Sequence, residues 1–161
     1  MFLPTSLKIL SLDEIISSVK KWKKEKRKVV FTNGCFDIIH LGHVDYLEKA
    51  SSLGDKLIVA INTDQSVKKL KGEKRPIVNE YARARIIASL ECVHAVILFD
   101  EETPFSLIHA ILPDILVKGA DYKIENIVGA DIVIQHGGEI KTINFVEGFS
   151  TTTIIEKIKK L

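Results

Sequence analysis

The chain has 161 residues, a formal net charge of +2 and an ordinary share of apolar and charged residues. This composition predicts a single globular domain with its own core. The small charge does not by itself predict nucleic-acid binding, and no apolar run reaches the roughly 18 residues of a membrane span. Two distant cysteines, Cys35 and Cys92, and the absence of a charged, cleavable leader favour a cytoplasmic protein with reduced thiols.

The first predicted element is a helix that begins at a capping box, Ser11–Glu14, and shows helical apolar spacing as far as Trp22. The lysine-rich residues 20–28 favour a solvated helix end over a nucleic-acid patch, because only one aromatic residue interrupts them. We therefore expect one domain over 1–161, in which 1–28 is an N-terminal helical extension.

A buried strand is predicted at Val29–Thr32 and a helix at His43–Leu53, with His40 and His43 at the junction. Free backbone N–H groups, the helix dipole and two imidazoles favour an anion there, and Gly42 would let a base or phosphate approach. The alternative is a pair of surface histidines. A zinc site would need a third ligand, which the cysteine spacing does not supply, so no metal ligands are predicted.

A second strand is predicted at Asp55–Asn62. The segment 66–78 follows, with five basic residues, Gly72 and Pro76. This composition predicts a mobile cationic loop. Either it only solubilises the chain or it binds a polyphosphate, and the nearby anion site favours binding.

The next predicted elements are a helix, a strand and a shorter helix. The first helix is predicted at Glu80–Val93, with an apolar face of Ala82, Ile86, Ile87 and Leu90. The strand is predicted at His94–Phe99. The shorter helix is predicted at Phe105–Leu112, with Thr103 as N-cap and Pro104 at the first helical position.

A fourth strand is predicted from Asp114 and ends at Lys118-Gly119, so that Lys118 and Asp121 lie at the sheet edge of His40, either in the site or as an ordinary ion pair. A helix over 127–136, a strand over 139–146 and a last helix after a Ser/Thr cluster at 150–153 complete the chain. The cluster is either ordinary capping or a second phosphate site. The alternation predicts an α/β fold, a five-stranded parallel doubly wound Rossmann-like sheet of order 3-2-1-4-5.

Two motifs carry a family resemblance. Residues 31–37 followed by His40-Leu-Gly-His43 resemble the signature of the nucleotidyltransferase superfamily that includes cytidylyltransferases, and residues 147–155 resemble its second signature. Segments 70–76 and 118–122 are most similar to the heptose 1-phosphate adenylyltransferase branch. Cytidylyltransferases that act on glycerol phosphate carry a different, tryptophan-containing sequence in place of 118–122, which argues against that activity. The likeness extends from about Leu12 to Leu161.

The resemblance implies transfer of AMP from ATP, with Mg²⁺, to D-glycero-β-D-manno-heptose 1-phosphate, giving ADP-heptose for lipopolysaccharide and pyrophosphate. A polyol or amino-alcohol phosphate cytidylyltransferase and a non-catalytic nucleotide sensor are the alternatives. The partners expected from the resemblance are ATP, a sugar phosphate and a separate heptose kinase upstream. We expect no nucleic-acid or membrane partner. Monomer and homodimer both stay open.

The resemblance assigns residues to three roles. The catalytic candidates are His40, His43 and Lys71; the nucleotide-binding ones are Thr32, Asn33, Gly34, Phe36, Gly42, Arg83, Lys118, Gly119, Ser150, Thr151 and Thr152; the acceptor-binding ones are Asp37, Asp121 and Tyr122. Many superfamily members carry an arginine before the second signature, where this chain has Val146-Glu147. Arg83, Lys71 or another residue must then meet the phosphate charge.

Overall fold

A computed structural model describes residues 4–161. At its centre lies a five-stranded sheet of order β3-β2-β1-β4-β5, in which every pairing is parallel. This arrangement confirms the predicted fold class and strand order. The strands are β1 (Val29–Gly34), β2 (Lys56–Asn62), β3 (Ala95–Phe99), β4 (Ile115–Gly119) and β5 (Glu139–Ile143).

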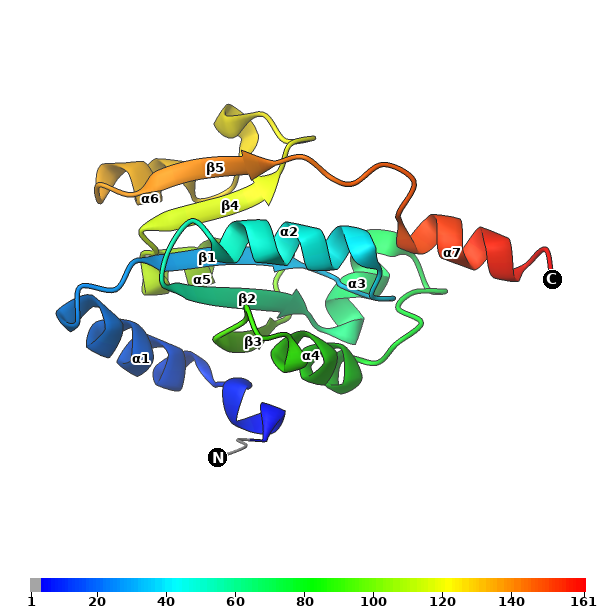
Figure 1. Ribbon diagram of the computed structural model, residues 1–161, viewed down its shortest axis with the longest axis horizontal. Coiled ribbons are helices and arrows are strands. Elements are labelled where there is room, and N and C mark those ends of the chain that lie inside the picture. Colours follow the sequence, from blue (N-terminus) through cyan, green and yellow to red (C-terminus); the bar gives the residue numbers. More distant parts are fainter. Residues whose placement is uncertain (1–3) are drawn as a thin grey trace.

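Helices cover both faces of the sheet (Figure 1). They are α1 (Leu12–Lys24), α2 (Leu41–Ser51), α3 (Asp64–Lys71), α4 (Glu80–Ser89), α5 (Phe105–Ile111), α6 (Ala130–Gln135) and α7 (Thr151–Ile158), with 3₁₀ turns η1 (Thr5–Lys8) and η2 (Ile124–Asn126). Within residues 4–161, no helix has both the length and the apolar character to cross a bilayer.

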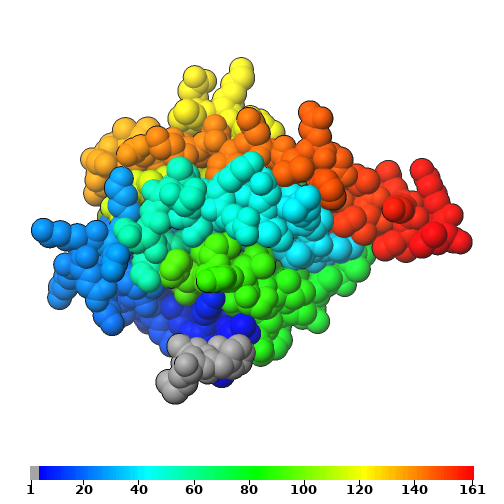
Figure 2. All heavy atoms as spheres, viewed as in Figure 1, coloured from blue at the N-terminus to red at the C-terminus, as the bar shows by residue number. Residues whose placement is uncertain are grey.

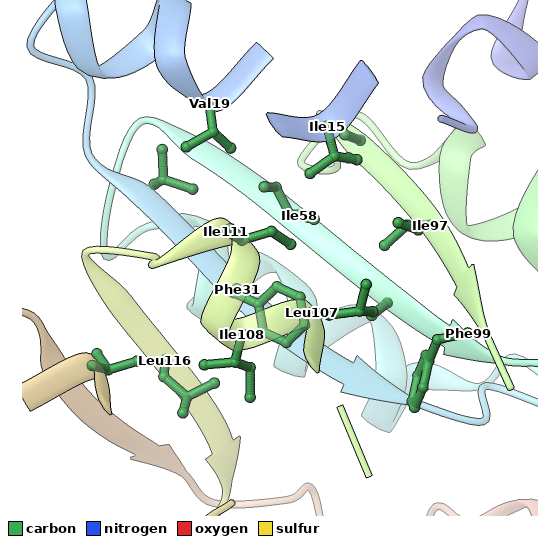
Figure 3. Close-up of a cluster of buried hydrophobic side chains, with 14 of the residues drawn as sticks. Ile15, Val19, Phe31, Ile58, Ile97, Phe99, Leu107, Ile108, Ile111 and Leu116 are labelled. Atoms are coloured by element: carbon green, nitrogen blue, oxygen red, sulfur yellow. The ribbon is translucent and has the colours of Figure 1, made fainter. Parts of the chain in front are cut away.

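The core consists of two clusters, one on each face of the sheet. Helices α1, α5 and α6 pack with residues such as Phe31 and Ile58 on one face (Figure 3). Helices α2 and α4 pack with Val30 and Val59 on the other. Adjacent strand residues point to opposite faces, so each central strand is covered on both sides and reads as a continuous apolar run.

The N-terminal helix begins as predicted. Ser11 accepts a hydrogen bond from the Glu14 backbone N–H, and the Glu14 carboxylate accepts one from the Ser11 backbone N–H. Ile15 and Val19 are buried against the sheet. This segment is therefore part of the main core.

The prediction of a mobile loop over 66–78 is wrong for its first part, because residues 64–71 form α3. Thr63 caps this helix by accepting from the Ser66 backbone N–H, and Val67 is fully buried. The lysines lie on the exposed side of the helix. The dense run of lysines hid a short helix in which Val67 is the one buried apolar residue.

The predicted helix at Glu80–Val93 ends early, at Ser89. Lys8 donates to the backbone oxygens of Leu90 and Val93, at 3.2 and 2.8 Å, and so satisfies carbonyls beyond the helix end. The buried face is also rotated from the predicted one: Ile86 is exposed, and Arg83 is buried in the position expected of an apolar residue.

Several other predicted ends shift for local reasons. Helix α5 takes Pro104 rather than Thr103 as its N-cap. Helix α6 begins after Gly129, whose left-handed backbone interrupts a helix expected from 127. Strand β5 ends at Ile143, since its partner β4 ends at the paired Gly119. Helix α2 starts at Leu41, two residues before the prediction, and ends at Ser51.

Candidate nucleotide-binding site

A pocket of about 650 Å³ lies at the carboxyl ends of the strands, where β1 has β2 on one side and β4 on the other. This is the point at which the winding of the sheet reverses, the usual ligand position in such folds. Twelve predicted site residues line it: Asn33, Gly34, Phe36, Asp37, His43, Lys71, Lys118, Gly119, Asp121, Tyr122, Thr151 and Thr152.

The two histidines are positioned by the start of α2. His40 is the N-cap of the helix, and His43 lies in its first turn. Their rings are stacked, with centroids 3.8 Å apart, and Phe36 packs against His43 edge-on at 5.2 Å. Among the described residues, neither Nδ1 atom has a hydrogen-bond partner.

Burial lowers the pKa of His40, and burial together with the adjacent His40 ring lowers the pKa of His43 to about 4. Both rings are therefore neutral near pH 7. A neutral imidazole still has one N–H to donate, so the pair can serve an anion through hydrogen bonds.

Gly42 lies beneath the His40 ring. A Cβ at this position would lie 3.0 Å from His40 Nδ1 and 3.1 Å from its Cε1. The absence of a side chain thus lets the His40 ring fold back over the helix start. That Gly42 also admits a base or a phosphate stays a prediction.

The opposite wall comes from the end of β4. Lys118 Nζ donates to Asn33 Oδ1 and lies 5.9 Å from the Tyr122 ring centroid. Burial lowers the pKa of Lys118 to about 8, although the nearby Asp121 carboxylate acts in the other direction. The predicted group of Lys118, Asp121 and Tyr122 is thus brought to one side of the pocket.

The start of α7 forms a second helix end at this pocket. Ser150 caps the helix by accepting from the Thr153 backbone N–H at 3.0 Å and is not itself a lining residue. Thr151 and Thr152 do line the pocket, and Thr151 donates to the Ile38 backbone oxygen at 3.4 Å. The N-termini of α2 and α7, which are far apart in the sequence, therefore lie close together (Figure 1).

Arg83, the predicted phosphate contact, lies outside the pocket lining and is fully buried. Its Nε donates to the Val78 backbone oxygen, its Nη1 to that of Cys35 at 2.6 Å, and its Nη2 to Asp64 Oδ1 at 2.9 Å. Each nitrogen is thus committed to a protein acceptor, and the guanidinium joins α4 to the β1 loop and to α3.

Asp37, a predicted acceptor-binding residue, is also buried. Its carboxylate accepts from the backbone N–H groups of Ile77 and Val78 at 2.9 and 2.8 Å, and from Arg75 Nε at 2.5 Å. Burial alone would raise the pKa of Asp37, but these hydrogen bonds outweigh it and hold the pKa below its usual value. The carboxylate therefore fastens the segment after α3, which is the second reason why 66–78 is not a free loop.

Thr32 is buried beside the pocket and does not line it. Its hydroxyl lies 2.8 Å from the Tyr46 hydroxyl and donates to the Val117 backbone oxygen at 3.1 Å. Tyr46 does line the pocket, and its ring stacks on Phe145 at 5.8 Å. Neither aromatic side chain was among the residues predicted for the site. Tyr46 could have been found from its position one turn after His43, whereas Phe145 reaches the pocket only through the sheet order.

Magnesium is the cofactor that the resemblance implies. No group of three or more His, Cys, Asp or Glu side chains within residues 4–161 is arranged to hold a metal ion. Mg²⁺ commonly keeps several waters and binds through substrate phosphates. The lining therefore fits an ion that arrives with a polyphosphate better than one held by a protein cage.

The chain is similar to known proteins both in sequence and in fold. A family model described as Cytidylyltransferase-like matches residues 31–157. The bifunctional protein HldE of Citrifermentans bemidjiense is 54% identical over 151 residues, which is 94% of this chain and 31% of that protein. HldE of Marinomonas sp. is 52% identical over 153 residues, 95% of this chain and 32% of that protein. The chain thus spans about a third of the length of the curated relatives it matches.

Among solved structures, the lipopolysaccharide core biosynthesis protein from Thermoplasma volcanium is 30% identical with a TM-score of 0.59, over 74% of this chain and 97% of that one. Pantoate-beta-alanine ligase from Francisella tularensis shares the fold at 16% identity and a TM-score of 0.57, over 95% of this chain and 78% of that one.

Proposed function

The chain belongs to the cytidylyltransferase-like family, and from this premise we propose that it transfers AMP from ATP to a sugar 1-phosphate. The proposed acceptor is D-glycero-β-D-manno-heptose 1-phosphate, and the products are ADP-heptose and pyrophosphate. Identity of 54% to a bifunctional HldE protein, and the likeness to a lipopolysaccharide core biosynthesis protein, support this choice. The proposal places the reaction in the cytoplasm, after a heptose kinase that makes the acceptor.

One observation carries the proposal. His43, from the first helix after β1, and Thr151 and Thr152, from the last helix of the chain, line one pocket together with Lys71 and Lys118. Helix N-termini, imidazole donors and lysines are all groups that favour phosphate oxygens. The volume of about 650 Å³ lies within the range of small-molecule sites.

The chemistry is an in-line displacement at phosphorus. An oxygen of the acceptor phosphate forms a bond to the α-phosphorus of ATP, and the bond from that phosphorus to the bridging oxygen of pyrophosphate breaks. The electron pair of the broken bond leaves with pyrophosphate. Because the attacking phosphate is already an anion, no general base is needed, and the protein acts by positioning and by stabilising charge.

Each group then has a defined task. His40 and His43 donate N–H groups to the α-phosphate region, while Lys71 and the hydroxyls of Thr151 and Thr152 hold the remaining phosphate oxygens. Mg²⁺ supplies charge neutralisation on the phosphates when it is bound. Lys118, Asp121 and Tyr122 form the wall for the nucleoside or the sugar.

Turnover of a substrate panel tests the proposal. The purified protein is given ATP or CTP with heptose, hexose and polyol phosphates, and pyrophosphate release is measured. We expect ATP with the heptose 1-phosphate to exceed every other pair by tenfold or more, roughly the discrimination that a few specific contacts supply. Preference for CTP with a polyol phosphate would instead establish the cytidylyltransferase alternative. Nucleotide binding without pyrophosphate release would establish a sensor.

A further inference from the structure

We propose that Arg75 is a phosphate-binding residue of this site and that Asp37 positions it. The inference rests on the proposed function, because it assigns the polyphosphate end of the same pocket.

Arg75 is the pocket arginine with hydrogen-bonding capacity to spare. It lines the pocket, and its side chain is 19% exposed. Nε donates to Asp37 Oδ2, whereas within residues 4–161 neither Nη group donates to a protein acceptor. Fixing Nε leaves the terminal pair of Nη groups as a fork, which matches two oxygens of a phosphate.

Asp37 makes that orientation rigid. Its side chain is 1% exposed, and its two oxygens also accept from the backbone N–H groups of Ile77 and Val78, just beyond Arg75. A buried carboxylate with these partners cannot rotate toward a ligand without leaving backbone donors unpaired. Its surroundings therefore favour a positioning role over direct contact with the acceptor.

Two other basic residues near Arg75, Arg83 and Lys71, differ from it in their contacts. Arg83 has all three nitrogens on protein acceptors, so it is not free to move to a phosphate without breaking α3 from α4. Lys71 ends α3, and the Arg75 backbone N–H donates to the Gly72 oxygen at 3.0 Å, which closes a turn between them. Lys71 and Arg75 both line the pocket that His43 lines.

Pyrophosphate binding tests the assignment without requiring turnover. Calorimetric titration with pyrophosphate compares the wild type with Arg75→Gln and Arg75→Lys. We expect Arg75→Gln to weaken pyrophosphate binding by tenfold or more, as for a lost charge-assisted bidentate contact, and Arg75→Lys to recover only part of it, because lysine lacks the fork. Arg85→Gln is the matched control, since Arg85 bonds to Thr5 and Tyr81 away from the pocket.

A parallel titration with the heptose 1-phosphate shows whether Arg75 contacts the pyrophosphate part of ATP or the phosphate of the acceptor. Pyrophosphate affinity of Arg75→Gln within twofold of wild type overturns the proposal, and so does a loss confined to the sugar phosphate. If the Arg75 effect is found but the wild type releases no pyrophosphate from any substrate pair, the proposed function fails while the phosphate contact stands.

The role of Asp37 is tested by a double-mutant cycle on pyrophosphate affinity. A positioning residue loses its effect once its target is gone. Asp37→Asn should therefore weaken binding in the wild type and add less than about threefold in the Arg75→Gln background. Equal losses in both backgrounds would show that Asp37 acts on the fold alone and not through Arg75.

Discussion

The imidazole rings of His40 and His43 lie stacked at 3.8 Å between centroids, and their planes are inclined by 24°. Two imidazolium ions would repel at this distance, and burial already disfavours the charged form of each. The free site therefore presents neutral donors. An arriving polyphosphate supplies the negative charge that makes protonation of either ring more favourable.

Replacing His43 by alanine tests its role in the reaction. Loss of one preorganised donor at a developing charge typically costs about 10²–10³ in rate. We expect His43→Ala to lower turnover by at least that factor while the circular dichroism spectrum stays unchanged. His109→Ala is a matched control, because His109 stacks on Phe105 in α5 and does not line the pocket. Near-normal turnover of His43→Ala would remove this histidine from the mechanism.

The stability of the fold should depend on pH through the buried histidines. The pKa of His43 is about 4 in the folded state, against 6.5 as its ordinary value. Between these values the unfolded chain binds the extra proton, so stability is fully present above about pH 6.5 and declines as the pH falls toward 4.

Urea unfolding at pH 7 and pH 5 measures this effect. The wild type should lose stability on acidification, and His43→Gln should lose less. Some loss should persist in the variant, because burial also lowers the pKa of His40 and His94. An identical pH dependence of the two proteins would contradict the buried, neutral state of His43.

The Gly42→Ala variant tests whether Gly42 is required for turnover rather than for the stability of helix α2. Alanine favours a helix by about 1 kcal/mol over glycine, so the fold should lose little stability. The new Cβ would lie 3.0 Å from His40 Nδ1 and displace that ring. We expect turnover to fall by roughly tenfold or more, as for a misplaced catalytic group. Lys49→Ala, on the exposed side of the same helix, should keep normal turnover.

Arg83 should behave differently from Arg75. Removing one partner of a buried, hydrogen-bonded ion pair typically costs on the order of 3–5 kcal/mol, and Asp64 keeps partial access to water, which reduces that cost. We therefore expect Arg83→Met to lower the free energy of unfolding by about 2 kcal/mol or more, measured with urea. An Arg83→Met protein with normal stability but no pyrophosphate binding would restore Arg83 as the phosphate contact.

The sequence predicted the sheet because its signals are local. Residues 29–31 and 57–61 are continuous apolar runs, and a capping box starts α1 at Ser11. The site residues near His43 and Thr151 follow from motifs at the ends of such elements. Parallel topology then brings them to one edge, whatever their separation along the chain.

The failures arise where a tertiary contact overrides composition. Nothing in the neighbours of Arg83 indicates that its charge is buried, since two of its three acceptors, the Cys35 backbone oxygen and the Asp64 carboxylate, are distant in the sequence. The segment after α3 looks flexible from its lysines, glycine and proline. Asp37, some 40 residues earlier in the chain, fixes it through the Ile77 and Val78 backbone.

Helix α7 projects beyond the carboxyl ends of the strands (Figure 1), and its atoms stand apart from the main body in Figure 2. None of the residues Thr151–Ile158 is buried, whereas α2 carries four buried residues. The pocket thus has one wall integrated into the core and another secured chiefly near the start of its helix. For the proposed transfer reaction, this difference favours substrate entry and product departure on the side of α7, while the wall that carries the histidines keeps its geometry.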